Sequence, residues 1–349
     1  MQLATRRPVV RRALPAALLL AVATACGRDE TTAPPVAVAG TVTVNASQGW
    51  AYLSLEDGTV VTPADPLRSE AWDMAFNATS VRLNGGEGGI GDVTGYCVCQ
   101  NSVTSPSNEE LLAMTPASEL ADFTAVGAQS VPAAGSFVAD QLTPALSGWH
   151  TGAGTSAAPA ARAWLVRLHD STTYAKLRVA SIAGASAATP GQVTFETATQ
   201  AGTAGALGAA RTVAVTVPAT GSVRVNLATG ATTTGADWDI ELQGWTIRVN
   251  GGASGAGKAA VATTESSFDA ITDAYAGAAQ AYRTDSYAGI FGQKPWYKYN
   301  LLGDHRMTPT FDVYLVRRGS QVYKVQLTDY YGPAGEVRRI TVRYELIAG

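Results

Sequence analysis

Apolar and polar side chains alternate over two short stretches near residue 75, a pattern typical of strands with one buried face. The apolar positions are Trp72, Met74 and Phe76 in the first stretch, and Val81 and Leu83 in the second. Alternate side chains of a strand lie on the same face of a sheet, so each stretch predicts a half-buried strand. Their short separation predicts a hairpin.

The turn of this hairpin decides which polar residues face each other. A two-residue turn at Asn77–Ala78 places one aspartate directly across from one arginine, and a turn at Gln243–Gly244 does the same in a second hairpin further along the chain. Opposite charges at facing positions stabilise a pair of strands. We therefore expect structural rather than catalytic ion pairs, Asp73–Arg82 and Asp239–Arg248.

The second hairpin repeats the first, and other segments recur in the same order. The segments 238–242 and 247–252 match 72–76 and 81–86, residues 314–317 match 164–167, and 342–345 match 193–196. Such ordered self-similarity indicates a tandem duplication. We predict an all-β fold with one or two short helices per repeat, in two copies of one antiparallel domain, over residues 40–200 and 211–349. The small-residue stretch 201–210 is the expected linker.

Further hairpins and helices follow from the same kind of pattern. Residues 164–168 should pair with 173–179, and residues 313–317 with 322–327 about a turn at Gly319–Ser320. One helix is expected near residues 109–114, capped by Ser107 or Asn108, and another around residues 268–279.

The first 25 residues have a different character, with four arginines before an apolar stretch that is too short to span a bilayer. This pattern predicts a secretory signal peptide. Small residues lead directly to Cys26, so we expect Cys26 to be lipidated and residues 26–39 to form a tether to the membrane. Ordinary cleavage after Ala25, which leaves a free Cys26, is the alternative.

The net charge and the cysteines bear on what the protein can bind. The formal net charge is −3, and removal of the leader arginines lowers it to −7, with 21 basic against 28 acidic residues. This balance argues against a nucleic-acid partner. Cys97 and Cys99 are two positions apart in a compartment that permits disulfides, so a local bridge or a shared contact to a soft metal is open to them. We expect a structural or loop role for the pair.

Catalytic signatures are lacking in the sequence. The chain has three histidines, at positions 150, 169 and 305, and no nucleophile elbow, paired-histidine motif or phosphate-binding loop. We therefore expect a binding protein rather than an enzyme.

The order of motifs in copy two resembles the HmuY family of haem-binding lipoproteins. These motifs are Trp238–Asp239, Arg248 to Gly252, Trp296 to Tyr299, Tyr314 to Arg317, Tyr323 to Leu327, Asp329 to Tyr331 and Val342 to Tyr344. Copy one keeps the hairpins and lacks the aromatic run. The resemblance implies an all-β lipoprotein at the outer membrane or cell surface that captures haem and delivers it to an outer-membrane transporter.

A haem site needs an iron ligand, a cation for the propionates and apolar walls. His305 or Met307 could ligate the iron, Arg306 could pair with a propionate, and the aromatic candidates for the walls are Trp296, Tyr297 and Tyr299. A solvated loop histidine and ordinary aromatic packing remain open for the same residues. The rival function is a β-sandwich adhesion or assembly module that binds glycan or protein.

Overall fold

The computed structural model describes residues 39–99, 105–275 and 282–349. The predicted signal peptide, the lipidation site Cys26 and all but the last residue of the tether lie outside these ranges. The compact unit described below spans Ala37–Gly349. None of the helices in the described ranges has the length and apolar composition that a membrane span requires.

The all-β prediction is confirmed, because the chain forms antiparallel sheets with three short α-helices in the part described. Two of these sheets pack face to face around one core, and we call this unit the first sandwich. One sheet has the order β1 (Ala39–Asn45), β24 (Val337–Ala348), β23 (Gln321–Tyr331), β22 (Val313–Arg318), β6 (Val93–Cys97). The other has the order β3 (Thr59–Val61), β2 (Ala51–Ser54), β4 (Met74–Asn77), β5 (Ser80–Leu83).

The second sandwich has the same construction. Its five-stranded sheet has the order β13 (Arg211–Thr216), β12 (Gln192–Ala201), β11 (Thr173–Ala183), β10 (Trp164–Arg167), β18 (Ala260–Thr263). Its four-stranded sheet has the order β15 (Ala231–Thr233), β14 (Val223–Asn226), β16 (Ile240–Gln243), β17 (Thr246–Val249). Each sandwich buries its own apolar cluster, so each has a separate source of hydrophobic stabilisation.

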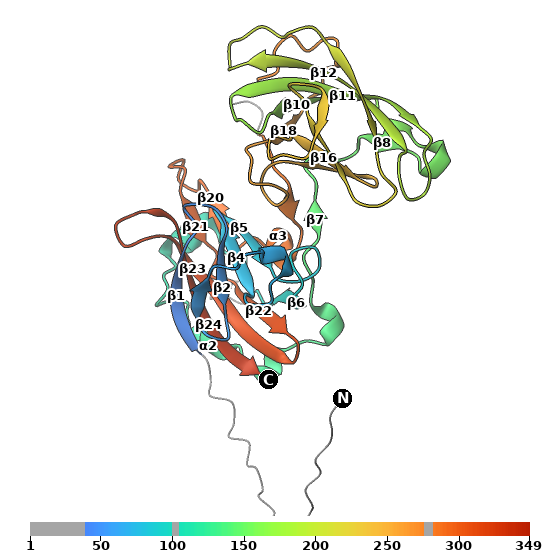
Figure 1. The fold of residues 1–349 in the computed structure, drawn as a ribbon. Coiled ribbons are helices and arrows are strands. Elements are labelled where there is room, and N and C mark those ends of the chain that lie inside the picture. The colour runs from blue at the N-terminus through green and yellow to red at the C-terminus, as the bar shows by residue number, and fades with distance from the viewer. Residues whose placement is uncertain (1–38, 100–104, 276–281) are drawn as a thin grey trace, which may run out of the picture. The chain divides into compact units, whose positions relative to one another are not determined.

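Each sandwich contains strands from both sequence copies. The first combines β1 to β6 of copy one with β22 to β24 of copy two, so blue and red ribbons lie in one sheet in Figure 1. The second combines β10 to β12 of copy one with β13 to β18 of copy two. The segment 201–210, expected to be a linker between domains, instead joins β12 to β13, which pair with each other.

Three two-stranded ladders complete the described fold. They are β7 (Leu142–Thr143) with β19 (Ser286–Tyr287), β8 (His150–Thr151) with β9 (Ala158–Pro159), and β20 (Tyr297–Tyr299) with β21 (Met307–Pro309). The α-helices are α1 (Asn108–Ala113), α2 (Leu120–Ala125) and α3 (Ile290–Gln293). Short 3₁₀ turns lie at Pro66–Arg68, Ala128–Ser130, Ala134–Ser136 and Gly154–Ser156.

The predicted hairpins and the first helix are confirmed. β10 pairs with β11, and β22 pairs with β23 about Gly319–Ser320. Helix α1 begins after Ser107, whose hydroxyl accepts from the Glu110 N–H while the Glu110 carboxylate accepts from the Ser107 N–H. This reciprocal capping box explains why the helix starts where the sequence indicates.

The second predicted helix is wrong over residues 268–275, the part of it that is described. Phe268 and Ile271 are buried in a small apolar cluster. The Lys176 ammonium donates to the carbonyls of both residues at 3.0 Å. These carbonyls are thereby satisfied without helical hydrogen bonds, and the segment stays irregular.

Candidate functional site

The β20–β21 hairpin carries the residues predicted for haem. Tyr299 of β20 lies opposite Met307 of β21, and His305 and Arg306 lie in the connecting loop. The structure therefore brings Tyr299, His305, Arg306 and Met307 together on one short element, at the surface of the first sandwich.

His305 is exposed, and one of its ring nitrogens has a defined partner. The Tyr299 hydroxyl lies 2.7 Å from His305 Nδ1, and the His305 N–H donates to the Asn300 side-chain oxygen. The backbone of His305 has a φ of +58°, in the left-handed region. When Nδ1 carries the proton and donates to Tyr299, Nε2 keeps its lone pair, as in histidines that ligate metals.

Met307 and Arg306 are both fixed against Tyr331 of β23. The Met307 N–H donates to the Tyr331 hydroxyl at 3.0 Å, and the Arg306 guanidinium carbon lies 4.4 Å from the centroid of the Tyr331 ring. The Met307 side chain is half-buried against the core of the first sandwich. Arg306 remains exposed and can therefore meet a carboxylate from solvent.

The predicted aromatic walls divide into core and surface residues. Trp296 is 1% exposed and its indole N–H donates to the Thr79 carbonyl at 2.9 Å, so it is part of the core. Tyr297 is half-buried and Tyr299 is 51% exposed. Tyr299 is therefore the aromatic candidate whose ring is open to solvent, whereas Trp296 attaches the hairpin to the core of the first sandwich.

The corresponding hairpin of copy one, β8–β9, has different chemistry. His150 of β8 packs against two indoles that stack on each other, with centroid distances of 4.6 Å to Trp149 and 4.7 Å to Trp245. Its Nδ1 is buried and has no hydrogen-bond partner among the described residues. His150 therefore lacks the hydrogen bond that orients His305.

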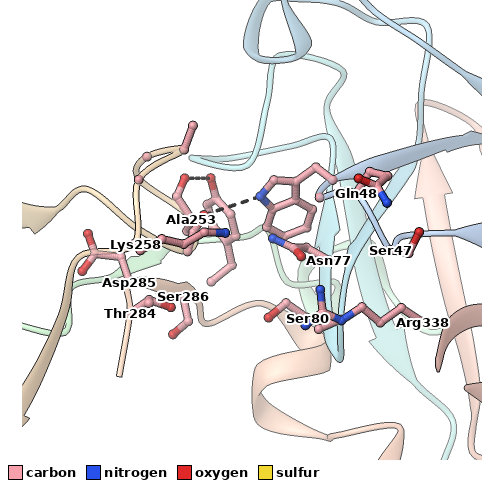
Figure 2. Close-up of a pocket in the computed structure, with 18 of the residues that line it drawn as sticks. Ser47, Gln48, Asn77, Ser80, Ala253, Lys258, Thr284, Asp285, Ser286 and Arg338 are labelled. Carbon is pink, nitrogen blue, oxygen red and sulfur yellow. Dashed lines mark hydrogen bonds between the residues drawn. The ribbon is translucent and has the colours of Figure 1, made fainter. Parts of the chain in front are cut away.

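A pocket of about 630 Å³ lies outside the β20–β21 hairpin. Figure 2 shows Asn77, Ser80, Lys258 and Arg338 among the residues that line it. None of the four hairpin residues lines this pocket. It is therefore separate from the β20–β21 site.

The predicted ion pair Asp73–Arg82 is wrong. Arg82 lies opposite Ala75, two residues further along the strand than expected. The shift arises because the two-residue loop is Ala78–Thr79, and its first residue, Ala78, has a φ of +51°. Asp73 instead accepts from the Leu55 N–H at 2.7 Å and lies 3.5 Å from Arg318 of copy two.

The predicted pair Asp239–Arg248 is wrong for the same reason, since Arg248 lies opposite Glu241. Its Nη1 is 3.8 Å from the Glu241 carboxylate. Asp239 accepts from the Leu227 N–H at 2.7 Å, and its other oxygen lies 2.8 Å from Nδ1 of His169 in copy one. Burial raises the pKa of both Asp73 and Asp239.

Arg82 is 4% exposed, and its guanidinium is surrounded by aromatic rings. Its guanidinium carbon lies 4.7 to 5.7 Å from four ring centroids, those of Trp50, Tyr52, Trp72 and Tyr287. Among the described residues, its Nε and Nη2 have no hydrogen-bond partner. Cation–π contacts therefore stabilise this charge.

Two buried carboxylates, Asp140 and Asp285, were not predicted from the sequence. Asp140 accepts from the Leu83 N–H at 2.8 Å, and Asp285 accepts from the N–H groups of Val249 and Ala145. Burial raises the pKa of Asp140 to about 7. The two aspartates occupy equivalent places in the two sandwiches, where each forms a bridge to a glycine. Their equivalent places in the two repeats are the sequence signal that identifies them.

Cys97 and Cys99 form a disulfide, the local bridge that the sequence left open. The Asp312 carboxylate lies within 4.8 Å of both sulfurs. Because the sulfurs are bonded to each other, they are not thiolate ligands for a metal in this state.

Comparisons with known proteins agree with the motif order. The sequence profile of the HmuY family, described as HmuY protein, matches residues 46–196 and 219–344. No curated protein sequence matches the chain.

Three solved structures are similar at low identity. One is described as an HmuY-like haem-binding protein from Bacteroides vulgatus (11% identity, 88% of this chain and 91% of that chain, TM-score 0.32). Another is the apo HmuY analogue of Tannerella forsythia (10% identity, 89% and 97% covered, TM-score 0.32). A third is described as a lipoprotein of Bacteroides fragilis (12% identity, 88% and 88% covered, TM-score 0.29).

TM-scores of this size do not align individual elements, so the assignment rests on the matched sequence segments. These segments are present in both copies and together make up most of the chain. The chain belongs to the HmuY family.

Proposed function

We propose that this protein binds haem through the β20–β21 hairpin, with His305 as an axial ligand of the iron. The observation that carries the proposal is the 2.7 Å contact between Tyr299 and His305 Nδ1. It orients an exposed imidazole and leaves Nε2 available, and a hydrogen bond to the second ring nitrogen makes the ligand more basic.

The other hairpin residues fit the remaining parts of a haem. Arg306 supplies a cation for a propionate, and the exposed ring of Tyr299 supplies a surface for the porphyrin. Met307 is the alternative iron ligand. His305 and Met307 are two residues apart on one hairpin, so they cannot approach opposite faces of one iron without a rearrangement of the loop. We therefore propose a ligand for only one axial position of the iron.

Family membership and the sequence of the leader support a proposal for the cellular role of the protein. We propose that Cys26 anchors the protein in the outer membrane and that the protein passes haem to an outer-membrane transporter. The anchor is supported by the residues that precede Cys26 and by the description of one structural neighbour as a lipoprotein.

A haemin titration of the chain from residue 27 onward tests the binding proposal. We expect a Soret band shifted from that of free haemin and saturating at a defined stoichiometry. Protoporphyrin IX without iron should bind more weakly, because axial ligation is then lost. A spectrum that stays that of free haemin would reject the proposal.

The rival function, an adhesion or assembly module, has support from the same hairpin. Tyr299 is 51% exposed, and tyrosine is enriched among the residues that dominate binding at protein interfaces. An unchanged haemin spectrum together with binding to a glycan array or a cell-surface protein would favour this rival.

A further inference from the structure

The pocket of about 630 Å³ in Figure 2 is more basic than the chain as a whole. Its lining includes three basic side chains, Arg167, Lys258 and Arg338, and one carboxylate, that of Asp285. Without the leader arginines, the chain has 21 basic against 28 acidic residues. A surplus of cations in a concave site raises the local concentration of anions. The charge of the lining therefore favours an anionic ligand.

Two of these cations have no partner in the part of the chain that the structure describes. No ion pair and no side-chain hydrogen bond joins the Lys258 ammonium or the Arg338 guanidinium to a described residue, and both side chains are exposed. Figure 2 shows them on opposite sides of the pocket. They are thus available to two separate negative groups of one ligand.

Asp285 does not neutralise this charge, because its carboxylate is already engaged by the backbone. Its oxygens accept from the Ala145 N–H at 2.8 Å and from the Val249 N–H at 2.9 Å, and the residue is 2% exposed. Arg167 also has a structural contact, since its Nε donates to the Lys258 carbonyl at 3.0 Å. Lys258 and Arg338 therefore remain as the cations that a ligand can meet directly.

A fourth cation, Arg82, lies behind the aromatic part of the lining. Its guanidinium carbon is 4.9 Å from the ring centroid of Trp50 and 5.7 Å from that of Tyr287, and both rings line the pocket. Arg82 is 4% exposed, and its Nε and Nη2 have no hydrogen-bond partner among the described residues. A buried cation without a charged partner acts through a low dielectric, so it adds to the positive potential at this wall.

The rest of the lining is polar and aromatic, which suits a sugar. Figure 2 shows Asn77 and Ser80 between Lys258 and Arg338. Amides and hydroxyls both donate and accept hydrogen bonds, as sugar hydroxyls require. The rings of Trp50 and Tyr287 meet edge to face at 6.4 Å and offer apolar surface beside these polar groups. The volume lies within the range of about 300–1,000 Å³ that is usual for small-molecule sites.

We propose that this pocket binds an acidic oligosaccharide, a sugar of disaccharide size with carboxylate or sulfate groups. Lys258 and Arg338 each pair with one anionic group, and Asn77 and Ser80 bind hydroxyls of the sugar. Arg82 strengthens the binding of the anion through its charge, without touching the ligand. None of the four hairpin residues proposed for haem takes part.

Calorimetric titration of the chain from residue 27 onward, without haemin, tests this proposal. The probe is a uronic-acid disaccharide with one sulfate, and a neutral disaccharide is the matched control ligand. We expect saturable binding of the acidic probe that weakens as salt is added. The neutral disaccharide should bind at least about tenfold more weakly, because it makes no charge-assisted hydrogen bonds. Equal affinities for the two sugars would overturn the proposal.

Three single variants locate the binding site. Lys258→Gln and Arg338→Gln should each weaken binding of the acidic probe by about tenfold, because each removes one charged partner. Arg68→Gln removes a cation whose side chain is 84% exposed and which does not line the pocket, so it should leave the affinity unchanged. The same loss in all three variants would indicate general charge attraction and contradict a site in this pocket.

Two further measurements separate this proposal from its alternatives. Inorganic sulfate should bind more weakly than the acidic disaccharide, and equal affinity would mean a simple anion site rather than a sugar site. His305→Ala should bind the disaccharide as the unmodified chain does. The result for the pocket and the result for haem can therefore fail independently of each other.

Discussion

At the scale of single residues, buried aspartates join segments that are far apart in the sequence. Asp73 and Asp239 each accept a backbone N–H and contact a basic side chain of the other copy. Asp140 and Asp285 occupy the junctions where the chain crosses between sandwiches. A buried acceptor of this kind is costly to remove, because its donors lose their partners.

Removal of Asp239 should therefore destabilise the fold. Asp239→Ala leaves the Leu227 N–H without its acceptor and His169 without its carboxylate. We expect a loss of about 1–3 kcal/mol in the free energy of unfolding, measured with guanidinium. Glu265→Ala, at an exposed position, should change it by less than about 0.5 kcal/mol. Equal effects of the two changes would contradict the assigned role of Asp239.

Asp140 should give the protein a pH-dependent stability. Burial raises its pKa from 3.8 to about 7, so between these values the folded state holds a proton that the unfolded state has lost. The free energy of unfolding therefore falls as pH rises through this window, by at most about 1.4 kcal/mol per pH unit for one group. The stabilisation is complete below pH 3.8 and is lost above about pH 7.

Asp140→Asn isolates this contribution. The variant has no titrating group at this position and retains an oxygen for the Leu83 N–H. We expect its unfolding free energy to fall less between pH 4.5 and pH 7.5 than that of the unmodified chain, whereas the exposed control Asp92→Asn should keep the original slope. Parallel slopes for all three proteins would show that Asp140 does not titrate in this range.

At the scale of elements, the β20–β21 hairpin depends on Trp296 for its attachment to the first sandwich. The Trp296 indole is buried and donates to the Thr79 carbonyl between β4 and β5. Trp296→Phe keeps an aromatic ring and loses this bond, so we expect a loss of about 1–3 kcal/mol in unfolding free energy. If Trp296 only supports the hairpin, the Soret maximum of the haemin complex should not move. A shifted maximum would indicate that Trp296 contacts the porphyrin.

The Cys97–Cys99 disulfide should contribute little to global stability. The bridge closes a loop with a sequence separation of only 2, and loop-closure entropy grows with loop length. We expect the double variant Cys97→Ser/Cys99→Ser to lose about 1–2 kcal/mol in unfolding free energy. A loss of unfolding free energy several times larger would contradict the loop-length argument. It would mean that the bridge also fixes the end of β6 against β22.

At the scale of the whole molecule, the sequence predicts the strands better than it predicts their partners. Alternation identified the hairpins, and Ser107 marked the start of α1. The exchange of halves could not be predicted, because equivalent strands of the two copies carry the same pattern. Local hairpin pairing is fixed by the turn, whereas pairing between β1 and β24 is fixed by contacts that either copy can offer.

In the candidate site too, the residues were predictable from the sequence but their contacts were not. The residues of the β20–β21 hairpin were predicted from their chemistry, since His305, Arg306 and Met307 lie between aromatic motifs. The hydrogen bond between Tyr299 and His305 depends on the hairpin register and was not predictable. The two predicted ion pairs were wrong because they also depended on the hairpin register. A two-residue shift in register keeps each side chain on its face of the sheet but changes its partner.

His305 is the residue that we propose as the ligand of haem iron. The most direct test compares haemin titrations of His305→Ala and His150→Ala, the second being the histidine of the corresponding hairpin in copy one. We predict that His305→Ala loses the Soret shift and that His150→Ala keeps it. A shift that survives His305→Ala, or that disappears with His150→Ala alone, would contradict the claim.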